Sequence, residues 1–161
     1  MTTGGFKTGI IHDVIVRPLN KYIDKRGWLA ELFRADELDA EVMPVMAYIS
    51  MTHPGIARGP HEHLNQTDSF FFIGPSTFKV YLWDTRAESP SCGIKQVILG
   101  GVDSPVMTVV PPGVVHAYKN VGTECGIVFN GPNQLYAGKG KKSPVDEIRH
   151  EDVAGSPFQL D

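Results

Sequence analysis

The feature of this sequence that most constrains its fold is a series of short apolar runs separated by glycine and proline. The runs are rich in β-branched and aromatic residues, and several alternate. In TFKVYLWD (77–84), Phe78, Val80 and Leu82 would share one face of a strand. With 17 glycines and 12 prolines available for turns, about eight or nine such runs predict an all-β sandwich or barrel.

The runs that we expect to form strands lie at 10–16, 28–34, 45–51, 69–74, 77–84, 94–99, 106–110 and 126–131. One short segment, RADELDAEV (34–42), is the helix candidate. No repeat, low-complexity tract or long linker divides the chain, and its length of 161 residues suits one domain with its own core. We therefore expect a single domain over residues 1–161 with few short helices.

Composition excludes several classes of function. A net charge of -3 and a pI of about 6.0 give no support to a nucleic-acid or anionic-membrane partner, which would call for a basic face, and leave room for a local basic pocket that binds a small anion. No apolar stretch approaches the ~18 residues that span a bilayer, and the N-terminus does not resemble a signal peptide. The two cysteines, Cys92 and Cys125, form no C-x-x-C motif. We expect a soluble, cytoplasmic protein with no nucleic-acid or membrane partner.

Two histidine motifs indicate where a functional site would form. In RGPHEH (58–63), His61 and His63 are two residues apart and would share a face of an extended strand. PPGVVHAYKN (111–120) reads P-x-G-x-x-H-x-x-x-N, a turn followed by a strand that carries His116. Two such strands facing each other would bring three histidines to one cavity.

This pair of motifs, H-x-H followed much later by P-x-G-x-x-H, resembles the two signature motifs of the cupin superfamily. The resemblance implies a small double-stranded β-helix, or jelly-roll, barrel. Metal-binding cupins usually add a glutamate shortly after H-x-H. Here that stretch reads LNQTDS, with Thr67 at the usual spacing between Gln66 and Asp68. The expected carboxylate is therefore missing or displaced.

Three imidazoles can nevertheless hold a divalent metal ion. A metal site remains an alternative, and its ligands would be His61, His63 and His116.

Further segments resemble the dTDP-4-dehydrorhamnose 3,5-epimerase family. They follow the family's order along roughly residues 12 to 158. They are DKRGWLAELFR (24–34), ARGPHEH (57–63), WDTRAESPS (83–91), PPGVVHAY (111–118), NQLYAG (133–138) and VDEIRHEDVAGSPF (145–158).

The resemblance implies an isomerase: an epimerase of a nucleoside-diphosphate 4-keto-6-deoxy hexose that needs no cofactor and forms a homodimer. The chemistry is proton transfer at a carbon next to the ketone. Such a C–H is acidic enough for a histidine base if the enolate is stabilised. Enzymes of this kind supply sugars for polysaccharide biosynthesis.

The family's catalytic residues can be carried onto this sequence. The base would be His61, and Asp152 in RHEDV would orient it, with Glu151 one step away. A carboxylate beside an imidazole fixes its tautomer and raises its basicity. Tyr136 would return a proton on the other face of the sugar, although a tyrosine at the rim of the site fits the same position.

Arg58 would contact the diphosphate, because a planar guanidinium matches phosphate oxygens. The nucleotide site would involve Arg26, Trp28 and Glu31, which in the family are often contributed across a dimer interface. Taken alone, Arg26 and Glu31 also fit a solvated strand face, and Trp28 also fits a core. The complete set of predicted substrate-binding residues is Arg26, Trp28, Glu31, Arg58, His63, Gln66 and His116.

The sequence departs from the family in one position that matters for chemistry. The family epimerases carry a lysine near the position of Thr67 that stabilises the enolate oxygen, and no lysine lies between His61 and Lys79 here. Protonated His63 or His116 could replace it. A metal ion held by the histidines could also do so as a Lewis acid.

Three other functions stay open. R-G-x-H-x-H also resembles the 3,4-ketoisomerases of dTDP-sugar pathways, although these lack the DKRGW-like and WDTRAESPS-like segments. The three histidines alone would fit a metal-dependent cupin enzyme. The missing lysine would fit a cupin that binds a sugar without catalysis.

Overall fold

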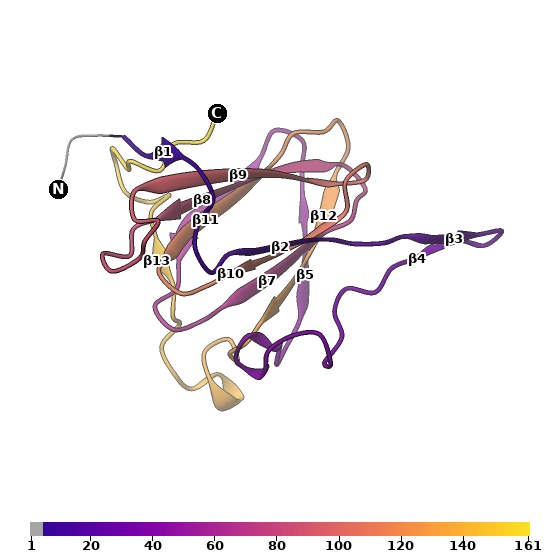
Figure 1. Cartoon of the computed structure of the whole chain (residues 1–161), viewed down its shortest axis with the longest axis horizontal. Coiled ribbons are helices and arrows are strands. Elements are labelled where there is room, and N and C mark those ends of the chain that lie inside the picture. Colours follow the sequence, from indigo (N-terminus) through magenta and orange to yellow (C-terminus); the bar gives the residue numbers. More distant parts are fainter. Residues whose placement is uncertain (1–4) are drawn as a thin grey trace.

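The computed structural model describes residues 5–161, which fold almost entirely into strands (Figure 1). One sheet has the order β1 (Lys7–Thr8), β9 (Ile94–Gly101), β8 (Thr77–Asp84), β11 (Val114–Asn120), β6 (Ala57–Glu62), β13 (Ile148–Arg149). The second has the order β2 (Ile15–Pro18), β10 (Val106–Val110), β7 (Asp68–Phe72), β12 (Gly126–Pro132), β5 (Tyr48–Thr52). All pairings are antiparallel except β1 with β9. The predicted all-β jelly roll is confirmed.

The alternation in β8 decides which side chains enter the core. Phe78, Val80 and Leu82 lie between the sheets with at most 1% of their surface exposed. They pack there against the aromatic side chains of β7, including Phe70 and Phe72. Burial of such side chains is the main favourable contribution to folding.

The opposite face of β8 is covered by the C-terminal segment. Tyr81 and Trp83 are as buried as the core side chains. The ring of Phe158 packs against Trp83, with centroids 5.6 Å apart, and the Tyr81 hydroxyl donates to the carbonyl oxygen of Asp161 at 2.8 Å. The tail therefore packs back on the body of the protein.

Several predicted elements are shorter than expected. The predicted strand at 10–16 becomes a strand only from Ile15, in β2, because a turn with Asp13 at a φ of 66° precedes it. The predicted strand at 28–34 is limited to β4 (Gly27–Leu29), which forms a hairpin with β3 (Tyr22–Asp24). This hairpin projects away from both sheets (Figure 1), so it has no neighbouring strand to extend it. The helix candidate at 34–42 forms only the 3-10 turn η1 (Ala40–Val42), because so short a helix is marginal without packing. The other helical turn, η2, is Lys139–Lys141.

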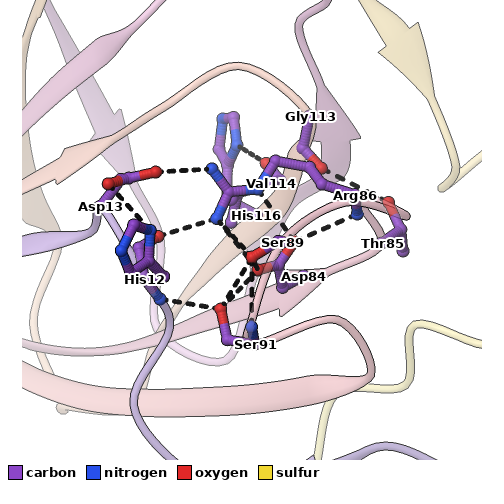
Figure 2. A network of polar contacts seen from close by, with 10 residues as sticks. All are labelled: His12, Asp13, Asp84, Thr85, Arg86, Ser89, Ser91, Gly113, Val114 and His116. Atoms are coloured by element: carbon purple, nitrogen blue, oxygen red, sulfur yellow. Dashed lines mark hydrogen bonds and ion pairs between the residues drawn. The ribbon is translucent and has the colours of Figure 1, made fainter.

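A buried carboxylate organises the WDTRAESPS segment (Figure 2). Asp84 is fully buried at the end of β8. It accepts from Arg86 Nε at 2.9 Å and from the Ser89 and Ser91 hydroxyls at 2.6 Å. Burial opposes ionisation of Asp84, but these hydrogen bonds hold its pKa below the usual range. Arg86 also donates to the carbonyl oxygen of His12, so the network fastens the N-terminal segment to β8.

Within residues 5–161, no helix is long and apolar enough to cross a membrane. Both cysteines, Cys92 and Cys125, are free thiols.

Candidate active site

A cavity of about 1030 Å³ opens beside β5, β6 and the long segment between β12 and β13. Its volume lies at the upper end of the range for small-molecule sites. The side chains on its wall include imidazole, phenol, guanidinium and carboxylate groups. The cavity is therefore equipped both to bind an anionic ligand and to move protons.

Three histidines lie together at this cavity: His61 and His63 line its wall, and His116 is buried beside them. His61 on β6 is paired directly with His116 on β11, and their ring centroids are 4.5 Å apart. His63 follows β6, with its centroid 5.7 Å from each of the other two. One nitrogen from each ring lies within 4.8 Å of the others. The structure thus brings the two histidine motifs to one place, as their patterns predicted.

Gly59 allows this close approach of β6 and β11. Its φ is +77°, a left-handed conformation that side chains rarely adopt. A Cβ atom there would lie 2.6 Å from the carbonyl oxygen of His116 and 3.0 Å from Nδ1 of His61. The glycine of RGPHEH is therefore required by the packing of the histidines themselves.

Asp68 is the carboxylate that contacts the histidines, and the sequence analysis gave it no role. It begins β7 and is only 1% exposed. Its Oδ2 lies 3.0 Å from Nε2 of His63 and 3.4 Å from Nε2 of His116. Burial opposes ionisation of Asp68, but the two imidazoles hold its pKa well below the usual range. The sequence did contain a signal for this role, because Asp68 is the single acidic residue in LNQTDS (64–69), the otherwise uncharged stretch after His63.

Backbone carbonyl groups hold the other nitrogens of these two rings. Nδ1 of His63 contacts the carbonyl oxygen of Asp146, and Nδ1 of His116 lies 3.0 Å from that of Val114. A carbonyl oxygen only accepts, so both Nδ1 atoms carry a hydrogen. Burial lowers the pKa of His63, but the Asp68 carboxylate outweighs burial and the net shift is upward.

His61 has a different electrostatic environment. Burial, followed by the neighbouring His116 and His63, lowers its pKa from 6.5 to about 2. The ring is therefore neutral at physiological pH. A neutral imidazole at a cavity wall is able to accept a proton from a bound ligand.

A polar layer extends from Asp68 to a tyrosine that the sequence analysis did not select. Asn130 Nδ2 donates to the Tyr48 hydroxyl at 2.7 Å and to Asp68 Oδ1 at 3.1 Å. Gln66 Nε2 donates to the same carboxylate oxygen at 3.1 Å. Burial, together with the charge of Asp68, raises the pKa of Tyr48 to about 12. Tyr48 is thus a protonated phenol in the cavity wall.

Two other predicted residues line the cavity. Tyr136 lies in the segment between β12 and β13, and 54% of its surface is exposed. The guanidinium of Arg58 donates to the Thr52 hydroxyl at 3.1 Å and to the carbonyl oxygen of Met51 at 2.9 Å. These contacts hold the Arg58 side chain in place at the wall.

Asp146 fastens the Tyr136 segment to the turn that follows β6. Its carboxylate accepts hydrogen bonds of 2.8–3.0 Å from three successive backbone N–H groups, those of Leu64, Asn65 and Gln66. Hydrogen bonds to an ionised acceptor are strong. The turn and the segment that carries Tyr136 are therefore positioned together.

The structure does not bring Asp152 to His61. Asp152 is exposed and lies outside the cavity wall, whereas its neighbour Glu151 lines the cavity. The backbone N–H of Glu151 donates to the carbonyl oxygen of Pro60 at 3.1 Å, which places residue 151 beside β6. The carboxylate in contact with the histidines is that of Asp68.

Arg26, Trp28 and Glu31 lie outside the cavity wall of their own chain. The Arg26 side chain is 83% exposed and pairs with Asp24 at the tip of the hairpin. Trp28 is 52% exposed, and the Lys21 ammonium lies 4.9 Å from its ring centroid.

Comparisons with known proteins agree with this architecture. The family model described as dTDP-4-dehydrorhamnose 3,5-epimerase matches residues 8–146. The probable low-salt glycan biosynthesis epimerase of Haloferax volcanii is 36% identical over 126 residues, 78% of this chain and 81% of that protein. A spore coat polysaccharide biosynthesis protein of Bacillus subtilis is 35% identical over 113 residues, 70% of this chain and 74% of that protein.

A solved structure shows the same cupin-type fold. It is the dTDP-6-deoxy-D-glucose-3,5-epimerase of Legionella pneumophila Philadelphia 1 in complex with dTDP-4-keto-L-rhamnose. The TM-score is 0.74 at 17% identity, covering 90% of this chain and 76% of that one. The family match and the two sequence relatives do not favour a ketoisomerase, a metal-dependent cupin enzyme that uses His61, His63 and His116, or a non-catalytic binder. The chain belongs to the dTDP-4-dehydrorhamnose 3,5-epimerase family, a family of sugar-nucleotide epimerases.

Proposed function

We propose that this protein epimerises a nucleoside-diphosphate 4-keto-6-deoxy hexose by removing and returning a proton next to the ketone. The observation that carries the proposal is the His61 imidazole in the cavity wall, packed against His63 and His116, in a chain of this family. The ligand of the Legionella relative, dTDP-4-keto-L-rhamnose, is a sugar nucleotide of this chemical class. The names of the two sequence relatives support a role in glycan or polysaccharide biosynthesis.

His61 is the proposed base. Its ring is neutral because burial and two neighbouring imidazoles disfavour the charged form. It accepts the proton from the carbon next to the ketone, whose acidity depends on stabilisation of the enolate. The Asp68 carboxylate lies against His63 and His116, and its charge offsets only part of the lowering of the His61 pKa.

Tyr136 is the proposed acid for the other face of the sugar. A hydroxyl on a loop that lines the cavity is able to protonate the enolate opposite to the base, which inverts the carbon. Tyr48 is a second phenol in the same wall, but its hydrogen bond from Asn130 ties it to the buried network. We therefore assign proton return to Tyr136 and a positioning role to Tyr48.

Arg58 is the proposed partner of the diphosphate. Its side chain is held at the cavity wall by Thr52 and Met51, and its remaining donors are available to phosphate oxygens. The acid–base steps need no organic cofactor. We also propose a cytoplasmic location, because Cys92 and Cys125 are free thiols, and cell fractionation tests it.

The working unit is proposed to be a homodimer in which the hairpin reaches the partner's cavity. The hairpin projects from the body (Figure 1) and exposes large apolar side chains, among them Ile23 at 80% and Trp28 at 52%. Such a surface is costly in water unless a partner covers it.

Subunit mixing tests this arrangement. The variants His61→Ala and Trp28→Ala are each expected to lose most activity, and a mixture of the two is expected to regain part of it. The reason is that the mixed dimer has one site with wild-type His61 and a wild-type hairpin from the partner. A monomer in light scattering, or no recovery after refolding the two together, would contradict the proposal.

Proton exchange tests the reaction itself. In D2O with dTDP-4-keto-6-deoxyglucose, NMR is expected to show deuterium entering next to the ketone with inversion. His61→Ala should slow exchange by about 10²–10⁴-fold, the usual contribution of a general base. Tyr136→Phe should retain exchange but lose inversion, because only proton return from the opposite face is impaired.

The matched control is His53→Gln, which alters an exposed histidine outside the cavity wall and should leave the rate unchanged. Wild-type exchange in His61→Ala would refute His61 as the base. An absence of exchange in the wild-type protein would refute the proposed substrate class.

The protonation state of His61 provides a pH test. Its pKa of about 2 lies below the 6.5 of a free imidazole, so the unfolded chain binds a proton there more readily than the folded one. Its contribution to stability is therefore present above pH 6.5 and declines as the pH falls below that value. Imidazole NMR of chelator-treated protein should show His61 neutral down to the onset of acid unfolding, whereas a titration near 6.5 would contradict its described environment.

A further inference from the structure

Three electron-rich atoms converge beside the cavity, where only His63 reaches the wall and the other two residues are buried behind it. The three atoms are Nε2 of His63, Nε2 of His116 and Oδ2 of Asp68, separated by 3.0 Å and 3.4 Å along the two contacts to the carboxylate. Two of them, Oδ2 of Asp68 and Nε2 of His116, are buried without a hydrogen-bond partner. Unpartnered buried polar atoms are costly, so a positively charged species is needed between them.

The geometry indicates whether this positively charged species is a proton or a metal ion. A proton shared by a ring nitrogen and a carboxylate lies close to the line between them, yet neither contact of Oδ2 has the alignment of a hydrogen bond. A metal ion lies off that line. When two ligand atoms each bind the ion at about 2.1 Å, and the ligand–metal–ligand angle lies between the octahedral and tetrahedral values, these two atoms are about 3.0–3.4 Å apart. The two observed separations match this range.

The other nitrogens of the rings are arranged as in metal-binding histidines. Such ligands donate their second ring N–H to a carbonyl or carboxylate, which fixes the tautomer with a free lone pair on the binding nitrogen. Nδ1 of His63 faces the carbonyl oxygen of Asp146, and Nδ1 of His116 faces that of Val114. The Gln66 Nε2 amide, which only donates, lies 3.3 Å from Nε2 of His63, which indicates a lone pair on this ring nitrogen; a metal ion would take the place of this contact.

We propose that His63, His116 and Asp68 bind a divalent transition-metal ion through Nε2, Nε2 and Oδ2, with a further ligand reaching the ion from the side of His63, the one of the three that lines the cavity. Two imidazoles and one carboxylate suit zinc, iron, manganese or cobalt better than calcium or magnesium, which prefer oxygen. His61 is left out of the ligand set because its role in the proposed function is that of the base.

The catalytic meaning of the site rests on the proposed function. A bound cation supplies a Lewis acid for the ketone oxygen, the task that falls to a lysine in the family epimerases. Thr67, near the position of that lysine, is adjacent to Asp68. Near this position, the family epimerases would supply the positive charge with a lysine, and this protein would supply it with a metal ion bound by Asp68.

The test is a titration of chelator-stripped full-length protein with Co²⁺, followed by visible absorption and by calorimetry. We expect one ion per chain, visible bands of a low-symmetry site, and displacement by Zn²⁺. Asp68→Asn and His116→Gln should weaken binding by at least about a hundredfold, since loss of a mere hydrogen-bond partner of a ligand costs about 10–100-fold. His61→Ala should bind Co²⁺ like the wild type.

Glu62→Gln is the matched control, because Glu62 lies between the two histidines of the motif but pairs with His150 at 2.9 Å. It should bind Co²⁺ normally. Circular dichroism of each metal-free variant checks folding, and if Asp68→Asn does not fold, His116→Gln and the wild-type titration decide. Failure of the wild type to bind Co²⁺ and Zn²⁺, or unchanged binding in His116→Gln, overturns the site. Loss of binding in His61→Ala overturns this ligand set.

The proton-exchange experiment keeps this inference separate from the proposed function. Exchange that persists fully in stripped protein that binds no metal overturns the metal site and leaves the epimerase proposal intact. Metal binding with no exchange of the sugar protons supports the site and overturns the proposed reaction.

Discussion

The contact of one buried carboxylate with two imidazoles is the interaction on which the rest of the site depends. Asp68 begins β7 in one sheet, and His116 lies on β11 in the other, so the contact links the two layers of the sandwich. Removing a charge from water costs several kcal/mol unless a positive partner compensates. The position of Asp68 therefore requires positive charge at the histidines, whether it is carried by protons or by a metal ion.

The surrounding chain is adapted to this requirement. Gly59 lets β6 approach β11 so closely that a Cβ atom would collide with the backbone of His116. Asp146 anchors the turn after β6 through three backbone amides and also holds Nδ1 of His63. The same residue positions the segment that carries Tyr136. The base, the buried network and the proposed acid are thus fixed relative to one another by few contacts.

The sequence allowed the fold to be predicted where alternation was regular. In β8 and β10 the predicted and observed boundaries agree, because side-chain direction in a strand has a strict period of two. The strand predicted at 28–34 ends at Leu29 because residues 30–34 have no strand beside them, which only tertiary structure reveals. The convergence of His61, His63 and His116 was predictable from motif spacing alone.

The roles of Asp68, Tyr48 and Asp146 were not predictable in the same way. Each acts through a contact between segments far apart in the sequence, such as that of Asp68 with His116. Such contacts depend on the register of two sheets, which no local pattern encodes. Asp152 shows that a motif can also suggest the wrong residue. Its place in RHEDV suggested a partner for His61, but the structure leaves its side chain exposed outside the cavity wall.

The central claim is that Asp68 and the histidines form one energetic unit across the two sheets. A double-mutant cycle tests it most directly, with urea unfolding of metal-free wild type, Asp68→Asn, His116→Gln and the double variant. The account predicts a coupling free energy of at least about 1 kcal/mol, because either single substitution leaves the other group buried without its partner. Strict additivity, within about 0.3 kcal/mol, would show that the two groups are merely close together and would contradict the account.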